Sequence, residues 1–171
     1  MATATTESPA ANAAADYRKH LYKIANDTGS AFMVTRHGEG LHGRPMANAK
    51  IEPDATVIYF ATQRASGKVD ELQHDPHVYL GYTNGTGSVW ASVTGTARVI
   101  DDRSKVKQLW SPVWKNWFSG PDDPNLVLIE VTPTHGEYWD AGSKALQLVK
   151  FAITAVTGKK LKEGDHAEVD L

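Results

Sequence analysis

The sequence predicts a mainly β (α+β) fold, either a small β-barrel or an antiparallel sheet with a few helices around it. Short runs rich in β-branched and aromatic residues alternate with Gly, Pro, Asn and Asp, as strands alternate with turns. Helical periodicity is confined to a few segments, too few for a sheet covered by helices on both faces. The length of 171 residues fits one such domain.

The N-terminal part is predicted to contain one short helix. Residues 1–14 are rich in Ala, Thr and Ser and offer little to bury, so a disordered leader is expected there. Tyr17, Leu21 and Ile24 then recur at helical spacing, with basic residues between them. This pattern predicts an amphipathic helix that ends near Gly29.

Strands are expected in the middle of the chain, where the hydrophobic period changes to two. The predicted strands cover 31–35, 55–60, 77–82, 88–100 and 126–131. The longest of them alternates apolar with polar side chains, and Gly95 within it indicates a bulge or a bend.

Two helices are expected between these strands. One covers 66–74 and ends before Pro76. The other is capped by Asp101 or Asp102, and Pro112 is expected to kink it or to split it in two.

The domain itself is expected to span residues 15–142. Residues 143–171 are predicted to form a C-terminal helix, over 146–156, and a charged, loose tail from residue 158. Basic and acidic side chains offset one another in this tail, as in a solvated segment.

Composition and charge exclude several classes of protein. With 18 Lys+Arg against 20 Asp+Glu, the net charge of -2 gives no global attraction to nucleic acid or to an acidic membrane surface. The absence of cysteine excludes disulfides, thiolate metal sites and a cysteine nucleophile. No apolar run of about 18 residues and no signal-peptide pattern occur. A cytoplasmic protein without nucleic-acid or membrane partners is expected.

No metal site is expected, although the chain has seven histidines. His37 and His42 form one pair in the sequence, and His74 and His77 form another. Neither pair has a third ligand at a spacing typical of metal sites, and an H-E-x-x-H motif is absent.

Residues 60–68 form a candidate anion site. A predicted strand ends, a polar loop follows, and a helix begins at Ser66, where unpaired N–H groups and the helix dipole favour an anion. Thr62 and Ser66 add hydroxyl donors, and Lys68 and Arg64 add positive charge. The alternative is that Ser66 only caps the helix while Lys68 lies in solvent.

A second informative stretch covers residues 43–48. Pro45 has no N–H, so this segment is expected to face something other than a neighbouring strand, such as a flat ligand. Arg44 and Met46 alternate to the same face and place a cation beside an apolar surface. The alternative is an edge strand with a solvent-exposed arginine.

These segments occur in one order that resembles the pyridoxamine 5'-phosphate oxidase-like split-barrel flavoproteins, and among them the general stress protein 26 group. The resemblance covers about residues 16–142. The motifs that carry it are Gly43-Arg44-Pro45-Met46, Tyr59-Phe60-Ala61-Thr62, Ser66-x-Lys68, His74-Asp75-Pro76-His77-Val78, Val93-Thr94-Gly95-Thr96-Ala97, Asp101-Asp102-Arg103, Trp117-Phe118, Asp122-Asp123-Pro124 and Glu137-Tyr138-Trp139-Asp140.

The resemblance implies an FMN-binding split β-barrel of about six antiparallel strands with a few flanking helices. It also implies a homodimer that holds the flavin between its two subunits; FAD or a deazaflavin is the alternative cofactor. The cofactor-binding residues that it implies are Arg44, Pro45 and Met46 along the ring, Phe60, Ala61 and Thr62 at ring and phosphate, Ser66 and Lys68 at the phosphate, and Trp139.

Two departures from the oxidases bear on function. Gly67 stands where the oxidases carry an arginine, which removes one phosphate-binding charge. After Trp139, the oxidases supply an Arg-x-His-x-Arg segment that grips pyridoxamine phosphate, whereas this chain has no arginine beyond Arg103. Oxidation of pyridoxamine 5'-phosphate is therefore not expected, and no catalytic residue is identified.

Two hypotheses follow from the resemblance and its departures. The first is a flavin-binding stress protein, and the alternative is a flavin-dependent oxidoreductase of unknown substrate. Trp110, Trp114 and Trp117 share one face if Pro112 only kinks the helix. They are expected in the core or at a dimer contact, and shielding of the flavin edge is the alternative.

Overall fold

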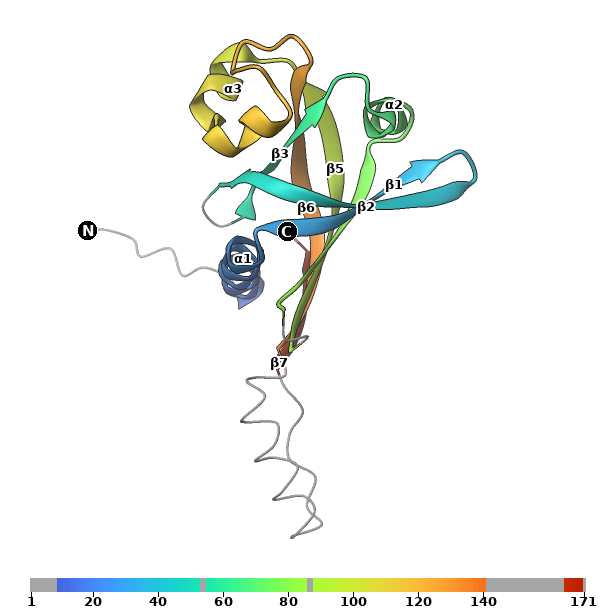
Figure 1. Cartoon of the computed structure of the whole chain (residues 1–171). Helices are drawn as coiled ribbons and strands as arrows, with labels where there is room; N and C mark the ends of the chain where they lie inside the picture. The colour runs from blue at the N-terminus through green and yellow to red at the C-terminus, as the bar shows by residue number, and fades with distance from the viewer. Residues whose placement is uncertain (1–8, 53–54, 86–87, 141–164, 171) are drawn as a thin grey trace, which may run out of the picture.

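The computed structural model describes residues 9–52, 55–85, 88–140 and 165–170 (Figure 1). Its helices are α1 (Pro9–Thr28), α2 (Gly67–His74), α3 (Arg103–Leu109) and the 3-10 helix η2 (Pro112–Asn116). Its strands are β1 (Ser30–His37), β2 (Gly40–Ile51), β3 (Ile58–Gln63), β4 (His77–Thr83), β5 (Val89–Ile100), β6 (Leu126–Asp140) and β7 (Asp165–Asp170).

Within the described residues, the sheet closes on itself. The strand order is β3-β2-β1-β4-β5-β6-β7, and β3 pairs with β6 as well as with β2, so β1 to β6 form a barrel. Every pairing is antiparallel. The long β6 strand uses Leu126–Val131 to pair with β3 and His135–Asp140 to pair with β7. The mainly β fold with about six antiparallel strands is confirmed.

The predicted strands are all present, with differences at their ends. The bulge predicted at Gly95 is confirmed, because the β5–β6 register shifts there. A Cβ at this position would lie 2.4 Å from the backbone oxygen of Thr132, which explains the need for glycine. The strand expected from residue 55 begins at Ile58, since Ala55 adopts a positive φ of 51°. β6 runs on to Asp140 because all of β5, from Val89 to Ile100, pairs with β6 between Leu128 and Asp140.

The helices differ more from the expectations. α1 begins at Pro9, so the prediction of a disordered leader is wrong from that residue on; residues 1–8 lie outside the described residues. α1 ends at Thr28, close to the predicted stop. The helix after β5 is split, as Pro112 predicts, into α3 and η2, and the Asp102 side chain caps α3 by accepting from two backbone N–H groups.

One described segment of the predicted C-terminal tail is a strand. It forms β7, which pairs with the far half of β6, so the prediction of a loose tail is wrong for Asp165–Asp170. An unpaired strand edge offers hydrogen bonds to any extended segment that reaches it, whatever its charge. The predicted helix over 146–156 lies outside the described residues.

Two hydrophobic clusters hold the fold together. The larger one fills the barrel and includes Tyr17 and Leu21 of α1 together with Met33, Leu80 and Val93 of the strands. The smaller one lies under α3 and η2, and it contains Tyr59, Val106, Leu109, Trp114, Phe118, Leu126 and Leu128. Figure 1 shows α3 and the following turn, in yellow, well apart from α1, in blue. Among the described residues, none of the helices combines the length and apolar character needed to span a bilayer.

Candidate functional site

A pocket of about 290 Å³ opens where β2, β3, α2 and η2 meet. Its walls are mostly apolar and aromatic, with polar groups from β3 and α2. The lining residues are Pro45, Met46, Ala47, Ala61, Thr62, Gln63, Lys68, Trp114, Trp117 and Phe118. The lining among the described residues includes no carboxylate and no imidazole, and Lys68 is its ionisable group.

The polar end of the pocket is a linked set of donors. The Lys68 Nζ donates to Thr62 Oγ1 at 3.1 Å, and Thr62 Oγ1 lies 3.1 Å from Ser66 Oγ. Ser66 precedes α2, but its side chain makes no capping hydrogen bond. Lys68 is half-buried rather than in solvent. Both alternatives considered from the sequence, a purely capping Ser66 and a solvated Lys68, are therefore wrong.

The charge on Lys68 is held in an unfavourable environment. Burial lowers the pKa of the Lys68 ammonium, and the neighbouring Arg44 guanidinium lowers it further, while Glu71 opposes both effects. An anion in the pocket would relieve this situation, because it would supply the opposite charge that a partly desolvated ammonium needs.

Pro45 lies where β2 has a strand on one side only. It pairs with Phe32 of β1, whereas β3 pairs with β2 only from Asn48 to Ile51. On the β3 side, Pro45 borders the pocket. The expectation that Pro45 faces something other than a strand is confirmed.

Arg44 turns away from the pocket lining. Its guanidinium donates to Glu71 Oε2 at 2.5 Å and to Thr35 Oγ1 at 2.5 Å, and its side chain is 17% exposed. The alternative of a solvent-exposed arginine on an edge strand is therefore wrong, and Arg44 instead ties β1 and β2 to α2.

The structure brings together only part of the predicted cofactor set. Pro45, Met46, Ala61, Thr62 and Lys68 line the pocket, and Ser66 adjoins it through Thr62. The remaining predicted residues lie elsewhere: Arg44 at Glu71, Phe60 in the barrel core, and Trp139 opposite Trp90 on the β5–β6 ladder.

Sequence reasoning missed part of the aromatic wall. Trp114 is buried and packs edge-on against Trp110, while Trp117 is exposed at the rim, so the tryptophans do not form one helical face. Phe118 is part of the Trp117-Phe118 motif, but the sequence assigns it no place in the pocket. The break at Pro112 was the available signal, because η2 begins there, and Trp114 and Phe118 share a hydrophobic cluster with Tyr59 of β3.

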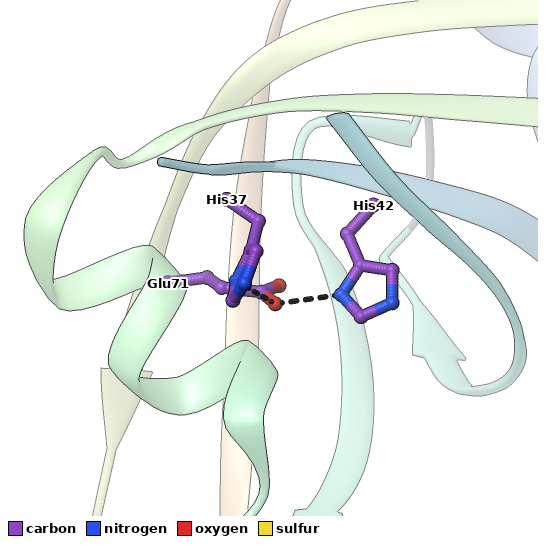
Figure 2. Close-up of side chains that lie close together, drawn as sticks. All are labelled: His37, His42 and Glu71. Carbon is purple, nitrogen blue, oxygen red and sulfur yellow. Dashed lines mark hydrogen bonds and ion pairs between the residues drawn. The ribbon is translucent and has the colours of Figure 1, made fainter. Parts of the chain in front are cut away.

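A second polar cluster joins Glu71 of α2 to His37 and His42 of the β1–β2 hairpin (Figure 2). Glu71 of α2 is buried, and its Oε1 atom lies 2.9 Å from His42 Nδ1 and 3.2 Å from His37 Nδ1. Burial by itself raises the pKa of the Glu71 carboxyl, but hydrogen bonds from Thr35, His42 and Arg44 outweigh it and bring the pKa to about 2. The sequence offers His37 and His42 no third ligand at a typical spacing, but the fold brings Glu71, 29 positions after His42, to both rings.

The closed antiparallel barrel with a pocket at a strand-to-helix turn defines the class of split β-barrel proteins. The sequence model described as pyridoxamine 5'-phosphate oxidase like matches residues 16–162. The chain belongs to this family.

Two curated relatives agree with this placement. Protein bli-3 of Neurospora crassa is 32% identical over 156 residues, which cover 81% of this chain and 75% of the relative. General stress protein 26 of Bacillus subtilis is 34% identical over 94 residues, which cover 53% of this chain and 67% of the relative.

Solved structures share the fold over most of the chain. A proposed general stress protein 26 from Jannaschia sp. CCS1 has a TM-score of 0.75 and 25% identity, covering 92% of this chain and 99% of its own. A general stress FMN/FAD binding protein from Xanthomonas citri has a TM-score of 0.64 and 25% identity, covering 78% of this chain and 92% of its own.

Proposed function

We propose that the protein is a flavin-binding general stress protein that holds FMN in the pocket between β2, β3, α2 and η2. The observation that carries the proposal is the combination of a mostly apolar pocket lining with one cationic group. Pro45, Met46 and Ala61 offer a surface for a ring system, and Lys68, Thr62 and Ser66 offer a charge and hydroxyls for a phosphate. The flavin-binding relative from Xanthomonas citri supports the same ligand class.

The single cationic end favours FMN over larger flavins. Lys68 is the one lining residue with a formal positive charge among the described residues, and Gly67 beside it adds none. One phosphate matches this arrangement, whereas the second phosphate and the adenosine of FAD would need further partners. FMN is therefore the proposed cofactor, with FAD and a deazaflavin as the alternatives for the experiment.

We further propose a homodimer with the flavin at the interface. Phe32, Tyr79, Trp90 and Trp139 are large, exposed side chains on neighbouring strands of the barrel. Trp139 lies away from the pocket of its own chain, so its predicted flavin contact would be made to the cofactor of a second subunit. An apolar face of this kind is typical of an interface between subunits.

Binding is favoured over catalysis as the main role. A flavin-dependent oxidoreductase needs space over the ring for a substrate and a group to handle its proton. Trp114, Trp117 and Phe118 occupy one wall of the pocket, and the described lining supplies no carboxylate or imidazole for proton transfer. The flavin, when bound, supplies the redox chemistry, and these residues hold and cover it.

The experiment is the identification and titration of the flavin. We expect the purified protein to release FMN on heating, as identified by chromatography against FMN, FAD and riboflavin. Flavin-free protein should bind FMN more tightly than riboflavin, and its tryptophan fluorescence should be quenched, because Trp114 and Trp117 line the pocket. Failure to bind any of the three flavins at micromolar concentration would overturn the proposal, and tighter binding of FAD would overturn the choice of FMN.

A further inference from the structure

The β1–β2 hairpin and α2 bring two imidazoles and one carboxylate to a single point. In the hairpin register, His37 is opposite Gly40 and His42 is opposite Thr35, so both histidines lie on the same face, as diagonal neighbours across the ladder. That face meets α2, where Glu71 is buried. Figure 2 shows the Glu71 carboxylate between the two rings, with one dashed contact to His42 and one to His37.

The spacing of the three groups fits ligands that share one metal ion. Their potential ligand atoms all lie within 4.8 Å of one another. The Glu71 Oε1 atom lies 2.9 Å from His42 Nδ1 and 3.2 Å from His37 Nδ1. Two ligands with metal bonds of about 2.1 Å are roughly 3.0 to 3.5 Å apart in octahedral or tetrahedral geometry. Small side-chain movements would therefore admit an ion.

The carboxylate is already held in place by groups outside this set. Glu71 Oε2 accepts hydrogen bonds from Arg44 and Thr35, both at 2.5 Å, which leaves Oε1 directed at the histidines. Such outer hydrogen bonds orient ligating carboxylates in known metal sites. The positive charge of Arg44 opposes a cation, so a site of micromolar rather than picomolar affinity is expected.

The two histidines are open to solvent, whereas the carboxylate is not. The exposed side-chain fractions are 71% for His37, 60% for His42 and 6% for Glu71. An ion can thus enter from solvent, and positions not taken by the three side chains remain open to water or to a further ligand. Two imidazoles and a carboxylate are a donor set typical of divalent transition metals, Zn²⁺ in particular.

We propose that His37, His42 and Glu71 form a binding site for a divalent transition-metal ion such as Zn²⁺. The site is separate from the proposed flavin pocket, since none of the three residues lines that pocket. It does not depend on whether a flavin binds.

Titration of Zn²⁺ into tag-free, chelator-treated protein tests the site by calorimetry. We expect one Zn²⁺ per chain, and a loss of affinity on the order of 100-fold in His37→Gln and in His42→Gln, because each removes one of three ligands. His20→Gln is the matched control, since His20 is an exposed histidine of α1 outside the cluster. Its Zn²⁺ affinity should equal that of the wild type.

Thermal unfolding provides a second, independent readout. Zn²⁺ should raise the midpoint of the wild type and of His20→Gln but not that of His37→Gln or His42→Gln, since a ligand stabilises only the state that binds it. The variants replace exposed side chains, and their midpoints without metal show that they fold. The proposal would be overturned if Zn²⁺ did not bind at concentrations below about 100 μM, or if all four proteins bound Zn²⁺ with equal affinity. His37, His42 and Glu71 would then form only a hydrogen-bonded cluster.

Discussion

At the scale of single residues, α2 contributes side chains to both the pocket and the polar cluster at the β1–β2 hairpin. Lys68 and Glu71 are one helical turn apart, and they differ in what they meet: Lys68 reaches Thr62 at the pocket, and Glu71 meets the β1–β2 hairpin. Arg44 lies close to both and is bound to Glu71, so its charge lowers the pKa of the Lys68 ammonium without being available to the pocket lining. Lys68 therefore carries most of the positive charge offered to a phosphate.

Replacement of Lys68 by Ala should weaken FMN binding about 10- to 150-fold, which corresponds to the loss of one charged hydrogen bond of about 1.5–3 kcal/mol. Riboflavin has no phosphate, so its affinity should be unchanged. Flavin fluorescence titration measures both. Lys23→Ala is the matched control, because Lys23 is an exposed lysine of α1 paired with Asp27, and it should bind both ligands as the wild type does. Equal losses for FMN and riboflavin would contradict a phosphate contact by Lys68.

The residues of the pocket and of the polar cluster beside it differ in how far the sequence predicts them. Thr62, Ser66 and Lys68 follow from a local pattern, a strand end followed by a helix start, and local patterns are visible in sequence. Glu71 was not predicted, because its contact with His42 joins residues 29 positions apart and depends on how α2 packs on the hairpin. The direction of the Arg44 side chain was missed for the same reason.

At the scale of elements, α1 is fixed to the barrel by Tyr17. The Tyr17 hydroxyl donates to the backbone oxygen of Ser92 at 2.8 Å and lies 3.3 Å from that of Glu137, and its ring covers Gly136 of β6. A Cβ at Gly136 would lie 2.1 Å from the hydroxyl oxygen and 2.4 Å from a ring carbon. Glycine at this position allows the helix to approach the strand.

Gly136→Ala should therefore destabilise the fold by about 1–3 kcal/mol, since extra volume in a packed contact forces a shift of helix or strand. For a domain of this size the melting temperature should fall by about 2–4 °C per kcal/mol, measured by circular dichroism. Gly120→Ala is the control, because a Cβ there meets nothing within 4 Å. In a Tyr17→Ala background, the same change at Gly136 should leave the free energy of unfolding almost unchanged. Additive effects of the two changes would show that Tyr17 is not the obstacle.

A helix or strand was predictable when its own sequence determines it. It was not predictable when it depends on pairing with a distant part of the chain. The alternation in β5 and the break at Pro112 are properties of single segments, and the structure confirms both. β7 and the full length of β6 depend on pairing between distant strands. Backbone hydrogen bonds can pair such segments even where they lack the β-branched residues that make a strand recognisable in the sequence.

At the scale of the whole molecule, four large side chains lie on one outer face of the barrel. In the strand registers, Phe32 is opposite Gly81, two residues from Tyr79, and Trp90 is opposite both Thr83 and Trp139. Residues two apart share a face of a strand, so all four side chains point outward together across β1, β4, β5 and β6. They are between 41% and 52% exposed, so about half of each large side chain faces solvent in the single chain.

Trp90→Glu should separate the proposed homodimer into monomers, because a charge within the proposed apolar interface must be desolvated and a tryptophan anchor is lost. Truncation of such anchors commonly costs about 2–4 kcal/mol, or roughly 30- to 1000-fold in the dimer dissociation constant. Light scattering should give twice the chain mass of 18.6 kDa for the wild type and the single chain mass for the variant at micromolar concentration. Tyr22→Glu, which changes an exposed aromatic residue of α1, should remain dimeric.

FMN affinity should fall with dissociation, since the interface then no longer closes the site. A wild-type protein that is monomeric with flavin bound would contradict both the dimer and the interface site.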